Sequence, residues 1–209
     1  VGKDVTLAQL RAQVYKSFYL AIGCQGGRTA GVPGEDAAGI QTAVALLRTV
    51  GGAESHKMTG KTVVIGGGNV AIDAARVALR CGSSDVTMVC LEPREKMPAS
   101  AEEIAEAEEE GTAIRCGYGP KEFLTKDGHV CGVVLKRCTG LYDAEGRFAP
   151  TYDESVTITL PCDNVVLSIG QCIQWGNLLD GEAVQLGRGQ GAVADAMTYQ
   201  TAQPDIFVG

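Results

Sequence analysis

The chain has 209 residues, of which 45% are hydrophobic and 21% charged, proportions that are ordinary for a soluble globular domain. Its net charge of −7 argues against a surface for nucleic acid or anionic lipid, and no apolar run reaches the ~20 residues that a membrane span requires. The 28 glycines fall in several separate turns, a distribution typical of nucleotide-binding loops and hairpins.

The first half of the chain alternates predicted strands and helices. Thr6 opens a short helix, and Gln9 is placed to complete its capping box. The turn-forming stretch GVPGED, with its Pro-Gly pair, separates the next two elements. The elements expected after the first helix are a buried strand over 16–23, a helix over 37–50, a strand over 61–65, a helix over 70–80 and a strand over 85–91.

The second half predicts a hairpin sheet followed by a return to the first sheet. Ser100 and Glu103 form a second capping-box pattern, which opens a glutamate-rich helix that ends near Glu110. Short strands follow over 113–160, with KDGHV and DAEGR as hairpin turns. An apolar strand over 163–170 and two short strands in the tail complete the prediction. The order is typical of an α/β, Rossmann-like dinucleotide-binding domain: a parallel sheet with helices, plus an antiparallel β-meander on one face.

The stretch IGGGNVAIDAA carries the fingerprint G-x-G-x-x-[GA] at Gly66, Gly68 and Ala71. The first glycine allows the tight turn after the strand, the second lets a pyrophosphate approach the backbone, and the small third residue lets the helix pack closely. The alternative is a simple packing turn. Because the motif follows an apolar strand and opens a helix, we favour dinucleotide binding, with the phosphates at the helix N-terminus.

The choice of dinucleotide depends on the residues after the next strand. Glu92 follows VTMVCL directly, where a carboxylate can accept hydrogen bonds from both ribose hydroxyls and would repel a 2′-phosphate. Arg94 favours NADP(H) instead, because a guanidinium can bind the 2′-phosphate. The alternative for Glu92 is an ordinary surface acid. We expect NAD(H) in preference to NADP(H).

The sequence lacks the residue patterns that several other classes of binding site and enzyme require. The eight cysteines include no C-x-x-C pair, which argues against a zinc site, an iron–sulfur cluster or a redox dithiol. We therefore expect no metal site, and reduced thiols in a cytoplasmic protein. No tyrosine has a lysine four residues later, so the short-chain dehydrogenase pair is missing as well.

Several motifs together resemble the small (beta) subunit of glutamate synthase and its relatives. They are AIGCQGGRTAGVPGEDAAGIQTAVALLRTV, VVIGGGNVAIDAAR, REKMPASAEEI, VVLSIGQ and VADAMTYQTAQPDIFVG. The resemblance covers essentially the whole chain. It implies a nicotinamide domain inserted in an FAD domain, with residues 1–34 and 190–209 as remnants of the FAD domain and 35–189 as the NAD(P)H-binding domain. The chain would then be a piece of a larger flavoprotein.

The resemblance also implies roles for particular residues. It assigns the pyrophosphate to five consecutive residues, Gly66, Gly67, Gly68, Asn69 and Val70. It places Asp73 near the nicotinamide, with a pairing to Arg76 as the alternative. It puts Ile169 and Gly170 at the end of the strand beside the nucleotide cleft. NADPH-using relatives often carry two arginines where this chain has Leu91 and Glu92, which agrees with the expected preference for NAD(H).

The function implied is hydride transfer from NAD(P)H to FAD in the full-length parent, with electrons passed on to iron–sulfur clusters or a partner subunit. No side chain of this chain needs to be a catalytic acid, base or nucleophile, since the cofactors supply the chemistry. Its partners would be the dinucleotide, the rest of the FAD domain and an iron–sulfur domain or larger subunit. We expect the chain by itself to bind nucleotide without turnover. The alternative is a non-catalytic dinucleotide-sensing or assembly module.

Overall fold

The computed structural model describes residues 1–52 and 56–209, which form two compact units. Unit 1 consists of residues 1–26 and 171–209, and unit 2 of residues 27–170. The sequence places the inserted domain at 35–189 instead. Residues 27–34 group with unit 2 because they are fastened to it: Pro33 O accepts from Phe123 N at 2.8 Å, and Gly170 O accepts from Arg28 N at 3.0 Å.

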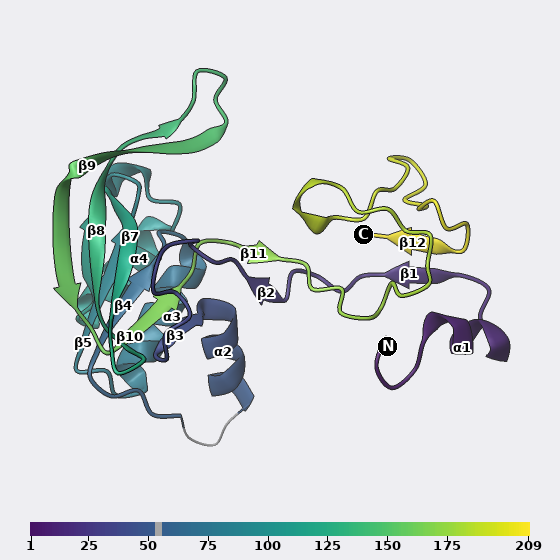
Figure 1. Ribbon diagram of the computed structural model, residues 1–209, viewed down its shortest axis with the longest axis horizontal. Coiled ribbons are helices and arrows are strands. Elements are labelled where there is room, and N and C mark those ends of the chain that lie inside the picture. Colours follow the sequence, from purple (N-terminus) through teal and green to yellow (C-terminus); the bar gives the residue numbers. More distant parts are fainter. Residues whose placement is uncertain (53–55) are drawn as a thin grey trace. The chain divides into compact units, whose positions relative to one another are not determined.

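A five-stranded parallel sheet forms the centre of unit 2 (Figure 1). Its strands run in the order β3-β10-β4-β5-β6, and every neighbouring pair is parallel. The three inner strands are rich in buried valines, as expected where both faces of a sheet are covered. Its strands are β3 (Ile40–Thr42), β4 (Lys61–Ile65), β5 (Asp85–Cys90), β6 (Ala113–Cys116) and β10 (Asn164–Leu167).

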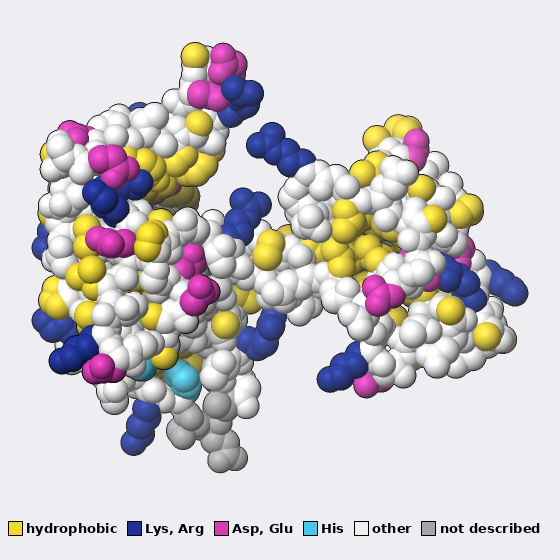
Figure 2. Space-filling view, viewed as in Figure 1, with side chains coloured by type: hydrophobic (Ala, Val, Ile, Leu, Met, Phe, Trp, Pro, Cys, Tyr) yellow, Lys and Arg dark blue, Asp and Glu magenta, His cyan; other side chains and the backbone are white. Residues whose placement is uncertain are grey.

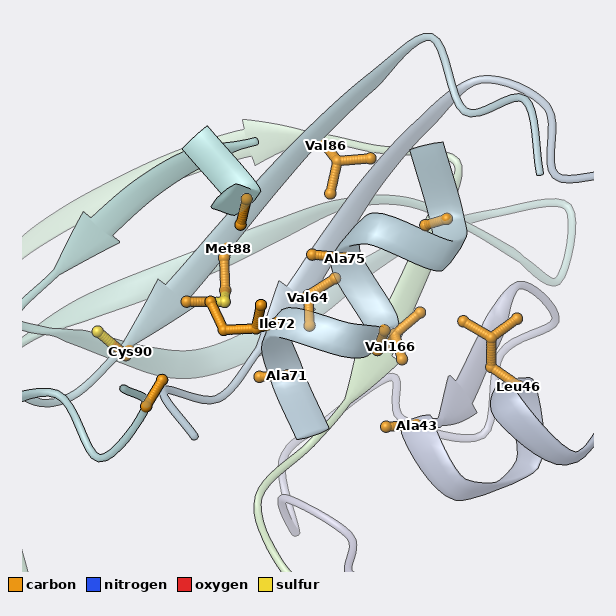
Figure 3. Packing of buried hydrophobic residues seen from close by; sticks show 14 of the residues in the cluster. Ala43, Leu46, Val64, Ala71, Ile72, Ala75, Val86, Met88, Cys90 and Val166 are labelled. Atoms are coloured by element: carbon orange, nitrogen blue, oxygen red, sulfur yellow. The ribbon is translucent and has the colours of Figure 1, made fainter. Parts of the chain in front are cut away.

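Helices cover one face of this sheet. They are α2 (Ala43–Gly52), α3 (Asn69–Arg80) and α4 (Ala101–Glu109), with the short 3-10 turn η1 (Arg94–Lys96) between β5 and α4. The face of α3 that meets the sheet consists of alanines and Ile72, all fully buried against Val64, Val86 and Met88 (Figure 3). These small side chains let the helix pack close to the sheet. The N-terminus of α3 follows the end of β4 after the three glycines at 66–68.

An antiparallel sheet covers the opposite face. It is formed by β7 (Tyr118–Lys126), β8 (His129–Tyr142) and β9 (Phe148–Pro161), paired in that order. Phe123, Val133 and Leu135 pack on the valines of the parallel sheet that point away from the helices. The predicted β-meander, its two hairpin turns and the α/β fold class are therefore confirmed.

Unit 1 has a small core of its own. The helix α1 (Leu7–Gln13) begins after Thr6, and the predicted capping box with Gln9 is present. The strands β1 (Phe18–Leu20) and β12 (Ile206–Val208) pair in parallel although they come from opposite ends of the chain. The remaining short elements are β2 (Gly26–Gly27), β11 (Gln171–Cys172) and the 3-10 turn η2 (Arg188–Gln190).

Three predictions about single elements are wrong in extent. The strand expected over 16–23 is limited to Phe18–Leu20 and is only partly buried, because Tyr19 is exposed. The helix expected from residue 37 begins at Ala43, since Ile40–Thr42 joins the edge of the parallel sheet beside β10. The strand expected over 163–170 ends at Leu167.

Two further details differ from the sequence analysis. The tail contains one strand, β12, plus isolated bridges, where two strands were expected. In α4, the Ser100 side chain accepts from Glu103 N as predicted, but in the described residues the Ser100 N–H donates to Asn69 Oδ1 and not to the Glu103 carboxylate. No helix in 1–52 or 56–209 is long and apolar enough to span a bilayer.

Candidate nucleotide-binding site

A cavity of about 660 Å³ lies at the carboxyl ends of the parallel strands in unit 2. The loops after β4, β5 and β10 line it, together with residues 28–32 and part of the antiparallel sheet. Parallel strands bring their carboxyl ends to one edge, which is where open α/β sheets bind ligands. The cavity volume falls in the range of small-molecule sites, roughly 300–1,000 Å³.

The three consecutive glycines have different surroundings. Gly66 has φ +146°, and a Cβ there would lie 2.3 Å from Ser168 O, so no other residue fits. A Cβ on Gly67 would lie 2.9 Å from both Cys90 Cβ and Glu92 Oε2. Gly68 has ordinary extended geometry, and nothing lies within 4 Å of a Cβ added to it. The protein itself therefore does not require a glycine at 68, whereas a ligand that approaches the backbone there would.

The N-terminus of α3 presents unused donors beside this space. Within residues 1–52 and 56–209, no acceptor contacts the main-chain N–H groups of Gly67, Gly68, Asn69 or Val70. Such groups, together with the positive end of the helix dipole, form an anion-binding site. The bare backbone and the free donors fit a pyrophosphate, so the predicted glycine loop has the geometry that its proposed ligand needs.

Glu92 and Arg94 have separate environments. Glu92 lines the cavity, and its main-chain O accepts from Gly117 N at 3.2 Å, which fixes the loop after β5. Arg94 is not among the lining residues. Its guanidinium is paired with Glu108 of α4 at 2.6 Å. Of the two side chains that the sequence offers for the adenosine ribose, the structure places only the carboxylate in the cavity.

Three other predicted residues on α3 lie outside the cavity lining. The Asn69 side chain accepts from Ser100 N at 3.0 Å and so ties the loop after β5 to the start of the helix. Val70 and Asp73 are exposed. The alternative for Asp73 is not found in the described residues, because Arg76 pairs with Glu106 and Glu110.

The segment after β10 brings one predicted residue to the cavity. Ser168 and Ile169 line it, while Gly170 does not. Gly170 has φ +109° and accepts from Arg28 N, which holds the start of the 28–32 segment beside the end of β10.

Sequence analysis missed two parts of the lining. One is the 28–32 segment, which lies in the turn-rich stretch before β3. The other is a set of side chains on the antiparallel sheet, namely Tyr118, Pro120, Lys136, Phe148, Pro150 and Tyr152. Phe148, Pro150 and Tyr152 are spaced two residues apart, which predicts that they share one face of a strand. The sequence does not show which part of the protein that face contacts.

Two groups of the cavity lining, the Cys90 thiol and the Tyr152 hydroxyl, have raised pKa values. Burial raises the pKa of the Cys90 thiol, and the neighbouring Cys116, whose Sγ lies 3.7 Å away, raises it further. Burial also raises the pKa of Tyr152. Both groups therefore keep their protons at neutral pH. Among the described residues, no cluster of three His, Cys, Asp or Glu side chains is arranged to hold a metal ion.

The family model for pyridine nucleotide-disulphide oxidoreductases matches residues 2–209. The chain belongs to this family. Among curated relatives, the subunit beta of the NADP(+)-dependent formate dehydrogenase of Moorella thermoacetica is 35% identical over 213 residues, covering 100% of this chain and 30% of that protein. The glutamate synthase (NADPH) small chain of Escherichia coli is 30% identical over 225 residues, covering 100% of this chain and 48% of that protein. The resemblance stated from the sequence motifs is thus confirmed.

Solved structures share the fold of this pyridine nucleotide-disulphide oxidoreductase. Mycobacterium tuberculosis FprA in complex with NADPH matches with a TM-score of 0.75 at 20% identity, covering 100% of this chain and 60% of that one. At that identity the likeness concerns the fold alone. The chain spans between about a third and a half of the length of the two curated relatives above.

Proposed function

We propose that this chain supplies the nicotinamide dinucleotide site of a flavin-dependent oxidoreductase. The observation that carries the proposal is the combination at the start of α3: free main-chain donors beside Gly68, whose missing side chain leaves open space. The family membership and the position of the cavity at the carboxyl edge of the sheet support it.

In this proposal the chain's own residues bind and orient the ligand. The pyrophosphate lies on the N–H groups of residues 67–70, and the Glu92 carboxylate accepts from the adenosine ribose. When bound, the nicotinamide would supply a hydride to the flavin of the full-length protein. The names of the relatives, a subunit beta and a small chain, favour a partner subunit as the acceptor. From the resemblance of the sequence motifs we further infer a larger parent with FAD and with iron–sulfur clusters or such a subunit as acceptor.

We further propose that the site binds NADH more tightly than NADPH. A 2′-phosphate would lie against the Glu92 carboxylate, and Arg94, two residues further along the same loop, is paired with Glu108 outside the cavity lining. The curated relatives above carry NADP(H) in their names, so their names favour the opposite preference for this chain. One measurement decides between the two.

The test is calorimetric titration of the chain with NADH and, separately, NADPH. We expect NADH to bind more tightly, and Glu92→Arg to shift the affinity ratio toward NADPH by about tenfold or more, the equivalent of one strong charge-assisted contact. Glu95→Arg is the matched control, because Glu95 is an exposed residue of the same loop outside the cavity lining.

Each other result has a definite meaning. Tighter binding of NADPH by the unaltered chain would overturn the NADH preference but keep the site. An unchanged ratio in Glu92→Arg would remove Glu92 from the ribose contact. Absence of binding by either nucleotide would contradict the proposed site.

A further inference from the structure

The second wall of the cavity comes from the antiparallel sheet and includes two tyrosines. Tyr118 begins β7, and Tyr152 lies in β9 where it pairs with β8. Beyond these positions the β8–β9 hairpin continues to a charged tip, where Arg147 pairs with Asp143 and Glu145 (Figure 2). The aromatic residues of the hairpin thus line the cavity, whereas its charged residues lie at the tip of the hairpin.

Tyr152 is held in place by its neighbours. The Lys136 ammonium lies 4.3 Å from the centroid of its ring and is itself fixed by Glu154 at 2.8 Å. Below the ring edge, a Cβ on Gly119 would lie 3.0 Å from Tyr152 Cε1 and 2.7 Å from Leu91 Cδ2. The absence of a side chain at 119 therefore lets Tyr152 and Leu91 each pack onto β7 at this position.

This arrangement places Tyr152 beside the loop that carries Glu92. Leu91, which shares the space over Gly119 with the tyrosine ring, directly precedes Glu92. The main-chain O of Glu92 accepts from Gly117 N at 3.2 Å, directly before Tyr118 at the start of β7, and both Glu92 and Tyr152 line the cavity. The cavity therefore runs from the glycine loop past Glu92 to Tyr152.

The order of groups along a dinucleotide then decides what meets the tyrosine. With the pyrophosphate at the start of α3 and the ribose at Glu92, the next group outward is the adenine base. Aromatic side chains stack on bases of any kind, and a ring that is already fixed loses little conformational entropy when it does so.

We propose that Tyr152 binds the adenine base of the dinucleotide, with its ring packed against the base. This inference rests on the proposed function and adds to it a residue on the antiparallel sheet, outside the glycine loop and the helix. The Lys136 and Gly119 contacts act as positioning elements in this inference, because they hold the ring.

The experiment compares NADH with ADP-ribose, which keeps the adenosine half and lacks the nicotinamide. We expect Tyr152→Ala to weaken the binding of both ligands by a similar factor of about ten, because both lose the same stacking contact. Tyr152→Phe keeps the ring and should bind both within about twofold of the unaltered chain. Tyr15→Ala is the matched control, because Tyr15 is an exposed tyrosine of unit 1.

A second variant distinguishes loss of the aromatic ring from loss of folding. Tyr152→Leu preserves apolar packing against Leu91 but has no ring, so it should fold and still lose the same affinity. Unchanged ADP-ribose binding in Tyr152→Ala or Tyr152→Leu, or a loss confined to NADH, would overturn the inference and leave the proposed function standing. If the unaltered chain bound none of NADH, NADPH and ADP-ribose, the proposed function itself would fail.

Discussion

Gly66 and Gly68 belong to the same motif but are glycines for different physical reasons. Gly66 is demanded by the fold, through its positive φ and the 2.3 Å approach of Ser168 O to an added Cβ. Gly68 meets neither condition, so under the proposed function the requirement for glycine at 68 comes from the bound ligand. The sequence motif predicts both roles, but only the three-dimensional surroundings separate them.

This difference makes opposite predictions for two similar substitutions. Gly66→Ala should destabilise the fold by about 1–3 kcal/mol because of the strained backbone and the clash. Gly68→Ala should cost less than about 1 kcal/mol, as at an ordinary helix N-cap, yet weaken NADH binding about tenfold or more. Thermal unfolding and calorimetric titration of both variants measure the two effects. A Gly68→Ala variant with unchanged affinity would contradict a pyrophosphate at this position.

At the scale of elements, the 28–32 segment is an irregular loop that nevertheless forms part of the cavity. The Glu35 carboxylate accepts from Ala30 N and Gly31 N, each at 2.7 Å, and so fixes the loop from behind. Gly34 has φ +82°, and its position against Phe123 O leaves no room for a side chain. The turn residues recognised in the sequence therefore act as a clamp for one wall of the site.

Loss of this clamp should loosen the wall. We expect Glu35→Ala to cost about 1–3 kcal/mol of folding stability, the usual effect of leaving two main-chain donors without a charged acceptor. Nucleotide binding should weaken about threefold to tenfold, because the loop must be ordered on binding. Asp36→Ala, at the exposed neighbouring position, should change neither quantity. Equal effects of the two variants in thermal unfolding and titration would rule out a special role for Glu35.

At the scale of the whole molecule, unit 1 brings together the two ends of the chain. Besides the β1–β12 pair, Arg11 of α1 contacts Glu182 at 2.6 Å and also pairs with Asp205, which precedes β12. The hydrogen bond from Arg11 lowers the pKa of the Asp205 carboxyl. An Asp with a lowered pKa stabilises the fold above the pKa of the unfolded side chain, about 3.9. That stabilisation is lost as the pH falls through the lower folded value.

Unit 1 should therefore become less stable as the pH falls below about 4. The chain's single tryptophan, Trp175, packs against the core of this unit, so its fluorescence follows the unfolding of unit 1. Asp205→Asn should lower the unfolding temperature at pH 7 and flatten its dependence on acid. Asp180→Asn, an exposed position of the same unit, should leave the profile unchanged. A variant Asp205→Asn with the original acid profile would contradict this role for the Arg11 pair.

The sequence by itself determined the features that depend on local signals. Buried valine runs, the glycine fingerprint, two helix caps and two hairpin turns were sufficient to predict the parallel sheet, the β-meander and the position of the glycine loop. They also identified Glu92 as a candidate for the ribose, because the residue after a parallel strand must lie at the carboxyl edge.

Only the tertiary structure decided which side chains meet. The short strand Ile40–Thr42 forms because β10 offers an edge to it, which no local pattern reveals. Arg94 lies outside the cavity lining and pairs with Glu108. Arg76 pairs with Glu106 and Glu110 rather than with Asp73. Tyr152 reaches the cavity because the antiparallel sheet packs on the face of the parallel sheet away from the helices. These outcomes depend on contacts between residues far apart in the chain, and local propensity carries no information about such contacts.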